Sequence, residues 1–122
     1  MRLGIGLIGP GLIGRELLSQ LRAQAPVLAS ERNLDLALLG VARSQRMVVS
    51  DTPIPYDEWE ERLGASTTAS DIHAFAHEVV RASRALSLHP VIVDCTGARH
   101  RAISDAAWAR SEAIHWGPSS LG

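Results

Sequence analysis

The chain has 122 residues, a net charge of −1 and 46% hydrophobic residues, which allows one domain with a core of its own. All 12 basic residues are arginine, so the chain has neither the lysine of a phosphate-binding P-loop nor a lysine for catalysis. The balanced charge, with only three Trp, one Tyr and one Phe, argues against a nucleic-acid partner.

The first half of the chain predicts a strand, a helix and a second strand. The apolar run at residues 3–8 is short and ends at a glycine and a proline, which favours a buried strand. An amphipathic helix follows from residue 12, and Pro26 marks its predicted end. A second apolar run, at 36–41, has the length of a strand, and 43–56 form a long connection in which 47–49 are a brief extended piece. The apolar positions of the helix are Ile13, Leu17, Leu18 and Leu21.

The second half predicts a short helix at residues 57–63 and a longer helix whose N-cap is Ser70. A third strand follows at 91–95, then a helix at 99–112 and the start of a fourth strand at 114–116. Strands that alternate with helices imply a parallel sheet with right-handed crossovers, which is an α/β fold. The apolar face of the longer helix comprises Ile72, Phe75, Ala76, Val79, Val80, Ser83 and Leu86.

Residues 9–14 read GPGLIG and fit the pattern G-x-G-x-x-G directly after a predicted strand and at the start of a predicted helix. This context is typical of a Rossmann-type dinucleotide site. In such a site Gly9 allows the tight turn, Gly11 lets a pyrophosphate approach the backbone, and Gly14 lets the helix pack close to the strand. The N–H groups around Leu12 and Ile13 and the positive end of the helix dipole face the phosphates. A glycine-rich turn without a ligand is the alternative.

The end of the second strand indicates which dinucleotide binds. An NAD site usually has an acidic residue there, for the ribose 2′-hydroxyl. Asp35 precedes the strand and therefore lies at the opposite end of the sheet, while the expected end carries Ala42, Arg43, Ser44 and Arg46. Two arginines and a hydroxyl suit the 2′-phosphate of NADP, with NAD as the alternative. Ordinary solvated loop arginines are the competing interpretation.

The third strand ends at the same edge. Thr96 and the backbone beside Cys95 are expected to contact the ribose or the nicotinamide end of the cofactor, and Asp94 either caps a turn or touches the ligand. Cys95 itself is interpreted as a small apolar residue rather than a nucleophile. His73 and His77 lie four residues apart on a helix, but no third ligand accompanies them, so we interpret them as a solvated pair and expect no metal site.

The single cysteine cannot form an internal disulfide and indicates a reducing compartment. No apolar run approaches the about 20 residues of a membrane-spanning helix, and the start of the chain lacks the pattern of a secretory signal. We therefore expect a cytoplasmic protein without a membrane partner. The tryptophans at 59 and 108 are interpreted as packing residues.

Four segments in the same order resemble the N-terminal cofactor domain of homoserine dehydrogenases, including the form fused to aspartate kinase. They are residues 6–14, residues 40–47, Trp59 and residues 93–96. The resemblance extends through about His115. It implies a single Rossmann-type domain over residues 1–116 that binds NAD(P)H for the reversible reduction of aspartate semialdehyde to homoserine, on the route to threonine and methionine.

The resemblance also assigns roles by position. The three glycines of the first segment would hold the pyrophosphate, Ser44 would lie beside the adenosine ribose or its 2′-phosphate, and Thr96 would lie near the nicotinamide half. Together with the neighbouring backbone, the predicted cofactor-binding residues are Gly9, Gly11, Leu12, Ile13, Gly14, Ala42, Arg43, Ser44, Arg46, Cys95 and Thr96.

The chain departs from the family pattern at two places. Gln45 stands where the family usually has arginine, so Arg43 or Arg46 would have to substitute for it. After the pair at 114–115 the family continues into a Thr-Pro-Asn-Lys segment and a substrate domain, whereas residues 117–122 form a divergent tail. We therefore expect a truncated homoserine dehydrogenase without catalytic residues, inactive alone. The alternatives are a stand-alone NADP(H)-binding module or sensor that acts with a partner chain, and a relic that binds nothing. A homo-oligomer is compatible with either of the binding interpretations.

Overall fold

The computed structural model describes residues 1–96 and 114–116, and within them one sheet contains five strands in the order β3-β2-β1-β4-β5. β1 is central and pairs in parallel with β2 and β4, and β5 pairs in parallel with β4. The strands are β1 (Arg2–Ile8), β2 (Asp35–Ala42), β3 (Met47–Val49), β4 (His89–Asp94) and β5 (Ile114–Trp116).

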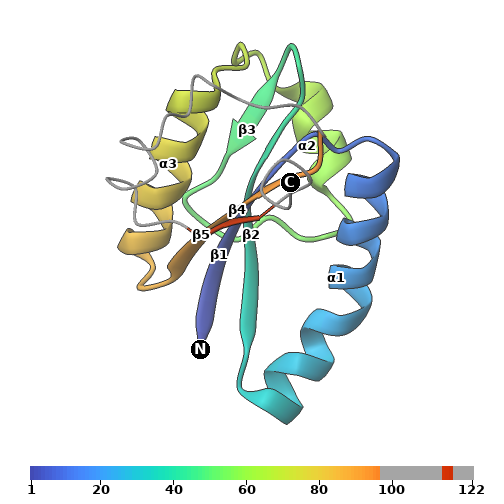
Figure 1. The fold of residues 1–122 in the computed structure, drawn as a ribbon, viewed down its shortest axis with the longest axis vertical. Helices are drawn as coiled ribbons and strands as arrows, with labels where there is room; N and C mark the ends of the chain where they lie inside the picture. The colour runs from blue at the N-terminus through green and yellow to red at the C-terminus, as the bar shows by residue number, and fades with distance from the viewer. Residues whose placement is uncertain (97–113, 117–122) are drawn as a thin grey trace.

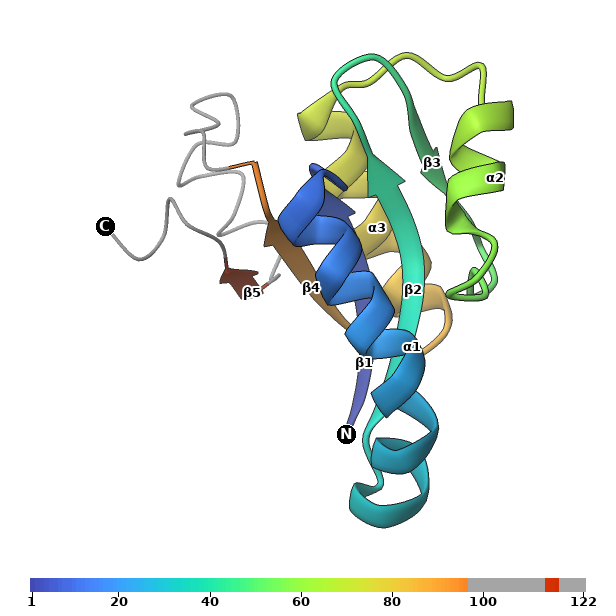
Figure 2. The ribbon, with the colours of Figure 1, turned by 90° about the vertical axis from the view of Figure 1, so that its right-hand side faces the viewer.

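Helices cover both faces of the sheet. α1 (Leu12–Arg32) and α2 (Trp59–Ala65) lie on one face, and α3 (Ile72–Ala85) lies on the other (Figures 1 and 2). Side chains alternate between the faces, so Leu7 packs with α1 and α2 whereas Ile8 packs with α3. The predicted α/β architecture of Rossmann type is therefore confirmed, with apolar cores on both sides of the sheet.

An irregularity in the central pairing brings α3 close to the sheet. The register of β1 with β2 shifts between Ile5 and Gly6, so that Leu39 and Gly40 both face α3. A Cβ on Gly40 would lie 2.9 Å from the Phe75 ring, and one on Gly6 would lie 2.8 Å from Val79. The helix thus packs against bare backbone, which the glycines of both strands make possible.

The sheet is not purely parallel as expected, because β3 is antiparallel to its neighbour. Residues 47–49 do form the brief extended piece predicted from the sequence, but they pair antiparallel to β2, with Val48 opposite Val41. A connection of only a few residues, 43–46, cannot cross over a sheet face, so it folds back as a hairpin. The prediction treated 43–56 as connection and missed this pairing.

α1 also differs from its prediction. The helix runs through Pro26 and ends at Asn33, which takes the left-handed conformation (φ 52°) and donates its N–H to the Leu28 carbonyl. Pro26 lies on the exposed side of α1, where water can hydrate the Arg22 carbonyl that loses its helical partner. Ile13, expected to face inward, is instead 63% exposed.

α3 follows its predicted face closely. Phe75, Val79 and Ser83 are fully buried against the sheet. Asp71, and not Ser70, is the N-cap, because its carboxylate accepts a hydrogen bond of 3.1 Å from the Ala74 N–H. The predicted helix at 99–112 and the tail at 117–122 lie outside the described residues.

The Tyr56 side chain fixes the connection before α2 to the sheet. Its hydroxyl donates a 2.6 Å hydrogen bond to the Leu36 carbonyl of β2, and burial raises the pKa of this phenol to about 12. A folded-state pKa above the unfolded value of about 10 stabilises the fold fully below about pH 10, and that stabilisation is lost as the pH rises toward 12.

We therefore expect Tyr56→Phe to lower the free energy of unfolding by about 1 kcal/mol at neutral pH, the size of one hydrogen bond. Urea unfolding at about pH 9 and about pH 11.5 should show a fall in wild-type stability that the variant shows less strongly. Equal pH dependence in the two proteins would contradict the buried hydrogen bond.

Candidate dinucleotide site

The carboxyl ends of β1, β2 and β4 lie side by side. Ile8 pairs with Ala42 on one side and with Asp94 on the other. The next residues continue this contact, because the Gly9 N–H donates to the Ala42 carbonyl at 2.9 Å and the Cys95 N–H donates to the Ile8 carbonyl at 2.8 Å. The three predicted parts of the site are therefore brought together at one sheet edge.

The glycine-rich turn has the geometry that its pattern predicts. Gly9 has φ 81°, a conformation that other residues rarely adopt, and a Cβ there would lie 2.5 Å from the methyl group of Thr96. A Cβ on Gly14 would lie 2.5 Å from the Gly9 carbonyl oxygen, so this glycine lets α1 start close against β1. The turn is thus closed on its inner side by backbone and by Thr96.

The outer side of the turn is open. A Cβ on Gly11 would meet nothing within 4 Å, and Gly11 is an N-cap without a side-chain hydrogen bond. The first helical hydrogen bond runs from the Arg15 N–H to the Gly11 carbonyl at 2.8 Å. The N–H groups that precede this bond have no carbonyl partner within α1 itself. Leu12 is 89% exposed, so its own side chain does not close this helix end.

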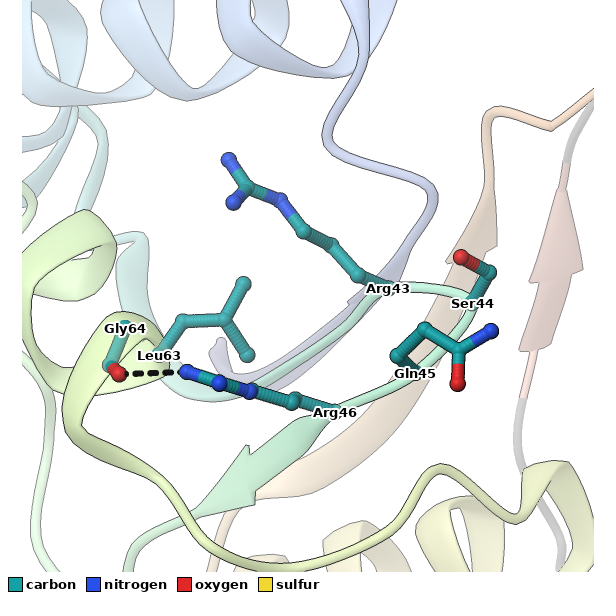
Figure 3. Close-up of a pocket in the computed structure, with 6 residues that line it drawn as sticks. All are labelled: Arg43, Ser44, Gln45, Arg46, Leu63 and Gly64. Carbon is teal, nitrogen blue, oxygen red and sulfur yellow. Dashed lines mark hydrogen bonds between the residues drawn. The ribbon is translucent and has the colours of Figure 1, made fainter.

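The loop between β2 and β3 forms a pocket of about 240 Å³ next to the turn (Figure 3). The Arg43 N–H donates to the Arg46 carbonyl at 2.8 Å and closes the loop, while the Arg46 guanidinium donates to the Gly64 carbonyl at 2.7 Å. Asp35 pairs with Arg2 at the opposite end of the sheet, as expected, so it cannot reach a ligand here. The pocket is lined by Arg43, Ser44, Gln45, Arg46, Leu63 and Gly64.

Three side chains beside this pocket were not predicted to belong to the site. Trp59 is buried, as predicted, but its ring also lies under two guanidinium groups, Arg15 at 5.4 Å and Arg43 at 5.9 Å. Arg15 forms two 2.8 Å hydrogen bonds with Glu60, and these hold the pKa of the Glu60 carboxyl below its usual range. No spacing in the sequence links positions 15, 43 and 59, so only the fold reveals this cluster.

At the end of β4, Asp94 is a turn cap. Its buried carboxylate accepts hydrogen bonds from the Thr96 N–H at 2.9 Å and the Thr96 hydroxyl at 2.7 Å, which holds the Thr96 methyl against the glycine turn. Cys95 is half-buried, and burial, together with the Asp94 charge, raises the pKa of its thiol. A raised pKa keeps the thiol protonated and weakly nucleophilic, which agrees with the packing role predicted for it.

His73 and His77 are both exposed, and the described part of the chain contains no group of three potential metal ligands. Among the described residues, no helix is long and apolar enough to cross a membrane.

A largely parallel sheet with helices on both faces and an open glycine-rich turn after its central strand defines a Rossmann-type nucleotide-binding domain. The family model described as "Homoserine dehydrogenase, NAD binding domain" matches residues 9–111. The chain therefore belongs to this family, and a nicotinamide dinucleotide is the cofactor class of the domain.

Relatives and solved structures agree with this assignment. The chain is 43% identical over 94 residues to a chloroplastic bifunctional aspartokinase/homoserine dehydrogenase 2 of Arabidopsis thaliana, and 39% identical over 94 residues to the corresponding enzyme 1 of Zea mays. In both comparisons 77% of this chain matches 10% of the relative, so the chain corresponds to a small part of those enzymes.

The fold is also similar to a crystal structure of homoserine dehydrogenase from Thermoplasma acidophilum. That similarity has a TM-score of 0.67 at 17% identity and covers 96% of this chain and 35% of that one.

Proposed function

We propose that this chain binds NADPH at the carboxyl edge of its sheet, with the pyrophosphate at the turn of residues 9–14. The single observation that carries the proposal is the open helix start at Gly11, where a Cβ would meet nothing within 4 Å and the N–H groups of Leu12, Ile13 and Gly14 have no carbonyl partner within α1. A diphosphate supplies acceptors for these groups and negative charge for the positive end of the α1 dipole.

The charges beyond β2 support NADP rather than NAD. An acidic residue that would accept a hydrogen bond from the ribose 2′-hydroxyl is absent from the pocket loop, which instead carries Arg43, Ser44 and Arg46. Arginine binds phosphate through charge-assisted hydrogen bonds. Gln45 also lines this pocket but contributes no charge.

The nicotinamide half of the cofactor would extend toward β4, beside Cys95 and Thr96. Asp94 fixes Thr96 through two hydrogen bonds, so the residue is held in place before any ligand arrives. When bound, the cofactor would supply the hydride for the reduction of aspartate semialdehyde to homoserine, a step toward threonine and methionine.

This chain supplies the cofactor side of that reaction. It contains no lysine, and the candidate site offers no group suited to transfer a proton to the substrate carbonyl. Hydride transfer needs the substrate held within a few ångströms of the nicotinamide. We propose that residues outside this chain, on a substrate domain or a partner chain, complete the enzyme. With its single unpaired cysteine, we propose that the domain works in the cytoplasm.

Calorimetric titration of the full chain with NADPH and with NADH tests the proposal. We expect both cofactors to bind and NADPH to bind more tightly. Absence of binding at about 1 mM of either cofactor, where even a weak site is occupied, would overturn it. Tighter binding of NADH would overturn only the preference for NADP.

A further inference from the structure

We infer that Arg43, supported by the ring of Trp59, is the residue that recognises the 2′-phosphate, and that Arg46 is instead a structural residue of the loop. This inference rests on the proposed function. Position 45 is a glutamine, so Arg43 and Arg46 are the only cations in the connection at 43–46.

Arg46 is already engaged. Its guanidinium donates a 2.7 Å hydrogen bond to the carbonyl of Gly64, in α2, and its own carbonyl accepts the Arg43 N–H. Arg46 also forms an isolated bridge with Ala69. In Figure 3 its side chain extends toward Gly64 and away from Arg43. These contacts tie the β2–β3 loop to the segment around α2, and a ligand would have to break the guanidinium contact before using it.

Arg43 is positioned but unpaired. The side chain is half-buried with its guanidinium 5.9 Å from the centre of the Trp59 ring, and it makes no hydrogen bond or salt bridge to any described residue. A guanidinium carries five N–H donors in a rigid fork that matches a phosphate. The Arg43 guanidinium therefore lies over the Trp59 ring, beside the pocket, with donors available for a ligand.

The neighbouring charged side chains leave the positive charge of Arg43 available to a ligand. Glu60 is near enough for its carboxylate to feel the charge of Arg43, but its two 2.8 Å hydrogen bonds go to Arg15. The Arg15–Glu60 pair is close to neutral, so Arg43 remains the uncompensated charge over Trp59. The ring is buried in the core with Leu7 and Leu18, which makes it a rigid support for the guanidinium. Trp59 thus acts as a positioning residue.

The test uses adenosine 2′,5′-bisphosphate and 5′-AMP, which differ only in the 2′-phosphate, titrated into the full chain by calorimetry. Wild type should prefer the bisphosphate. Arg43→Gln should lower affinity for the bisphosphate about tenfold or more and leave affinity for AMP within about twofold. Arg46→Gln, the matched control, should change both affinities by the same factor. Trp59→Leu should reduce the preference while Arg43→Lys retains part of it.

The outcomes separate the two proposals. If Arg46→Gln removes the preference and Arg43→Gln does not, or if wild type binds both nucleotides equally, the assignment of Arg43 is overturned while the dinucleotide site stands. If Arg43→Gln weakens both ligands equally, the residue is structural and the inference is again wrong. If wild type binds neither nucleotide and no NADPH, the proposed function itself fails. Circular dichroism of each variant confirms that it is folded.

Discussion

Replacing Gly14 by valine should lower the free energy of unfolding by about 3 kcal/mol, the upper range for overpacking a well-packed site. The Cβ alone would lie 2.5 Å from the Gly9 carbonyl oxygen and 3.3 Å from a methyl group of Leu7. The first contact is with backbone, which cannot rotate away as a side chain does, so α1 would have to move off β1. Urea unfolding followed by circular dichroism measures the change.

Gly64→Ala is the matched control for that prediction. This glycine also lies in a helix, but a Cβ there meets nothing within 4 Å. Alanine should raise stability by about 0.5–1 kcal/mol, because it loses less conformational freedom on folding than glycine. If the two variants had the same urea midpoint of unfolding, the claim that α1 packs closely against β1 at Gly14 would be contradicted.

Gly11→Val, in contrast to Gly14→Val, should leave the free energy of unfolding nearly unchanged and should abolish cofactor binding. A Cβ at Gly11 meets open space, so we expect a change in unfolding free energy within about 0.5 kcal/mol. The side chain would stand where the pyrophosphate approaches the backbone, and we expect NADPH affinity to fall about 100-fold or more. Calorimetry and urea unfolding on the same protein sample separate the two effects.

Leu12→Ala is the control for Gly11→Val. Leu12 is 89% exposed, so shortening its side chain leaves both the core and the backbone N–H groups in place. Its affinity for NADPH should stay within about threefold of wild type. Retained affinity in Gly11→Val, with both variants folded, would show that the pyrophosphate does not approach the turn at this residue.

Local patterns predicted most of the framework. The apolar runs that alternate with helices correctly predicted β1, β2 and β4. The spacing of the glycines predicted the turn before α1, because backbone conformation or close packing requires a glycine at these positions. The place of Asp35 followed from strand direction alone, and the structure confirms that it lies at the far end from the site. Local rules failed at Pro26, where the helix continues because the proline lies on its exposed side and water can hydrate the carbonyl that loses its partner.

The features that the sequence did not predict depend on contacts between distant segments. The register shift between Ile5 and Gly6 lies where α3 packs closely against the sheet, and no periodicity encodes it. The antiparallel pairing of β3 depends on the contact that residues 47–49 make with β2 across a short connection. Arg43, Trp59 and Arg15 come from three different elements and meet only when α1 and α2 share one face of the sheet. The sequence does not distinguish the two arginines of the loop, whereas in the structure Arg46 donates to the Gly64 carbonyl and Arg43 lies over the Trp59 ring.

The most direct test of the site is a set of backbone amide NMR spectra of the ¹⁵N-labelled full chain, recorded during titration with NADPH. N–H groups that gain a phosphate acceptor should show large shifts, so the account predicts that the amide signals of Gly11, Leu12, Ile13 and Gly14 move together and saturate with one binding constant. Saturable shifts elsewhere in the chain, with these four signals unmoved, would contradict it.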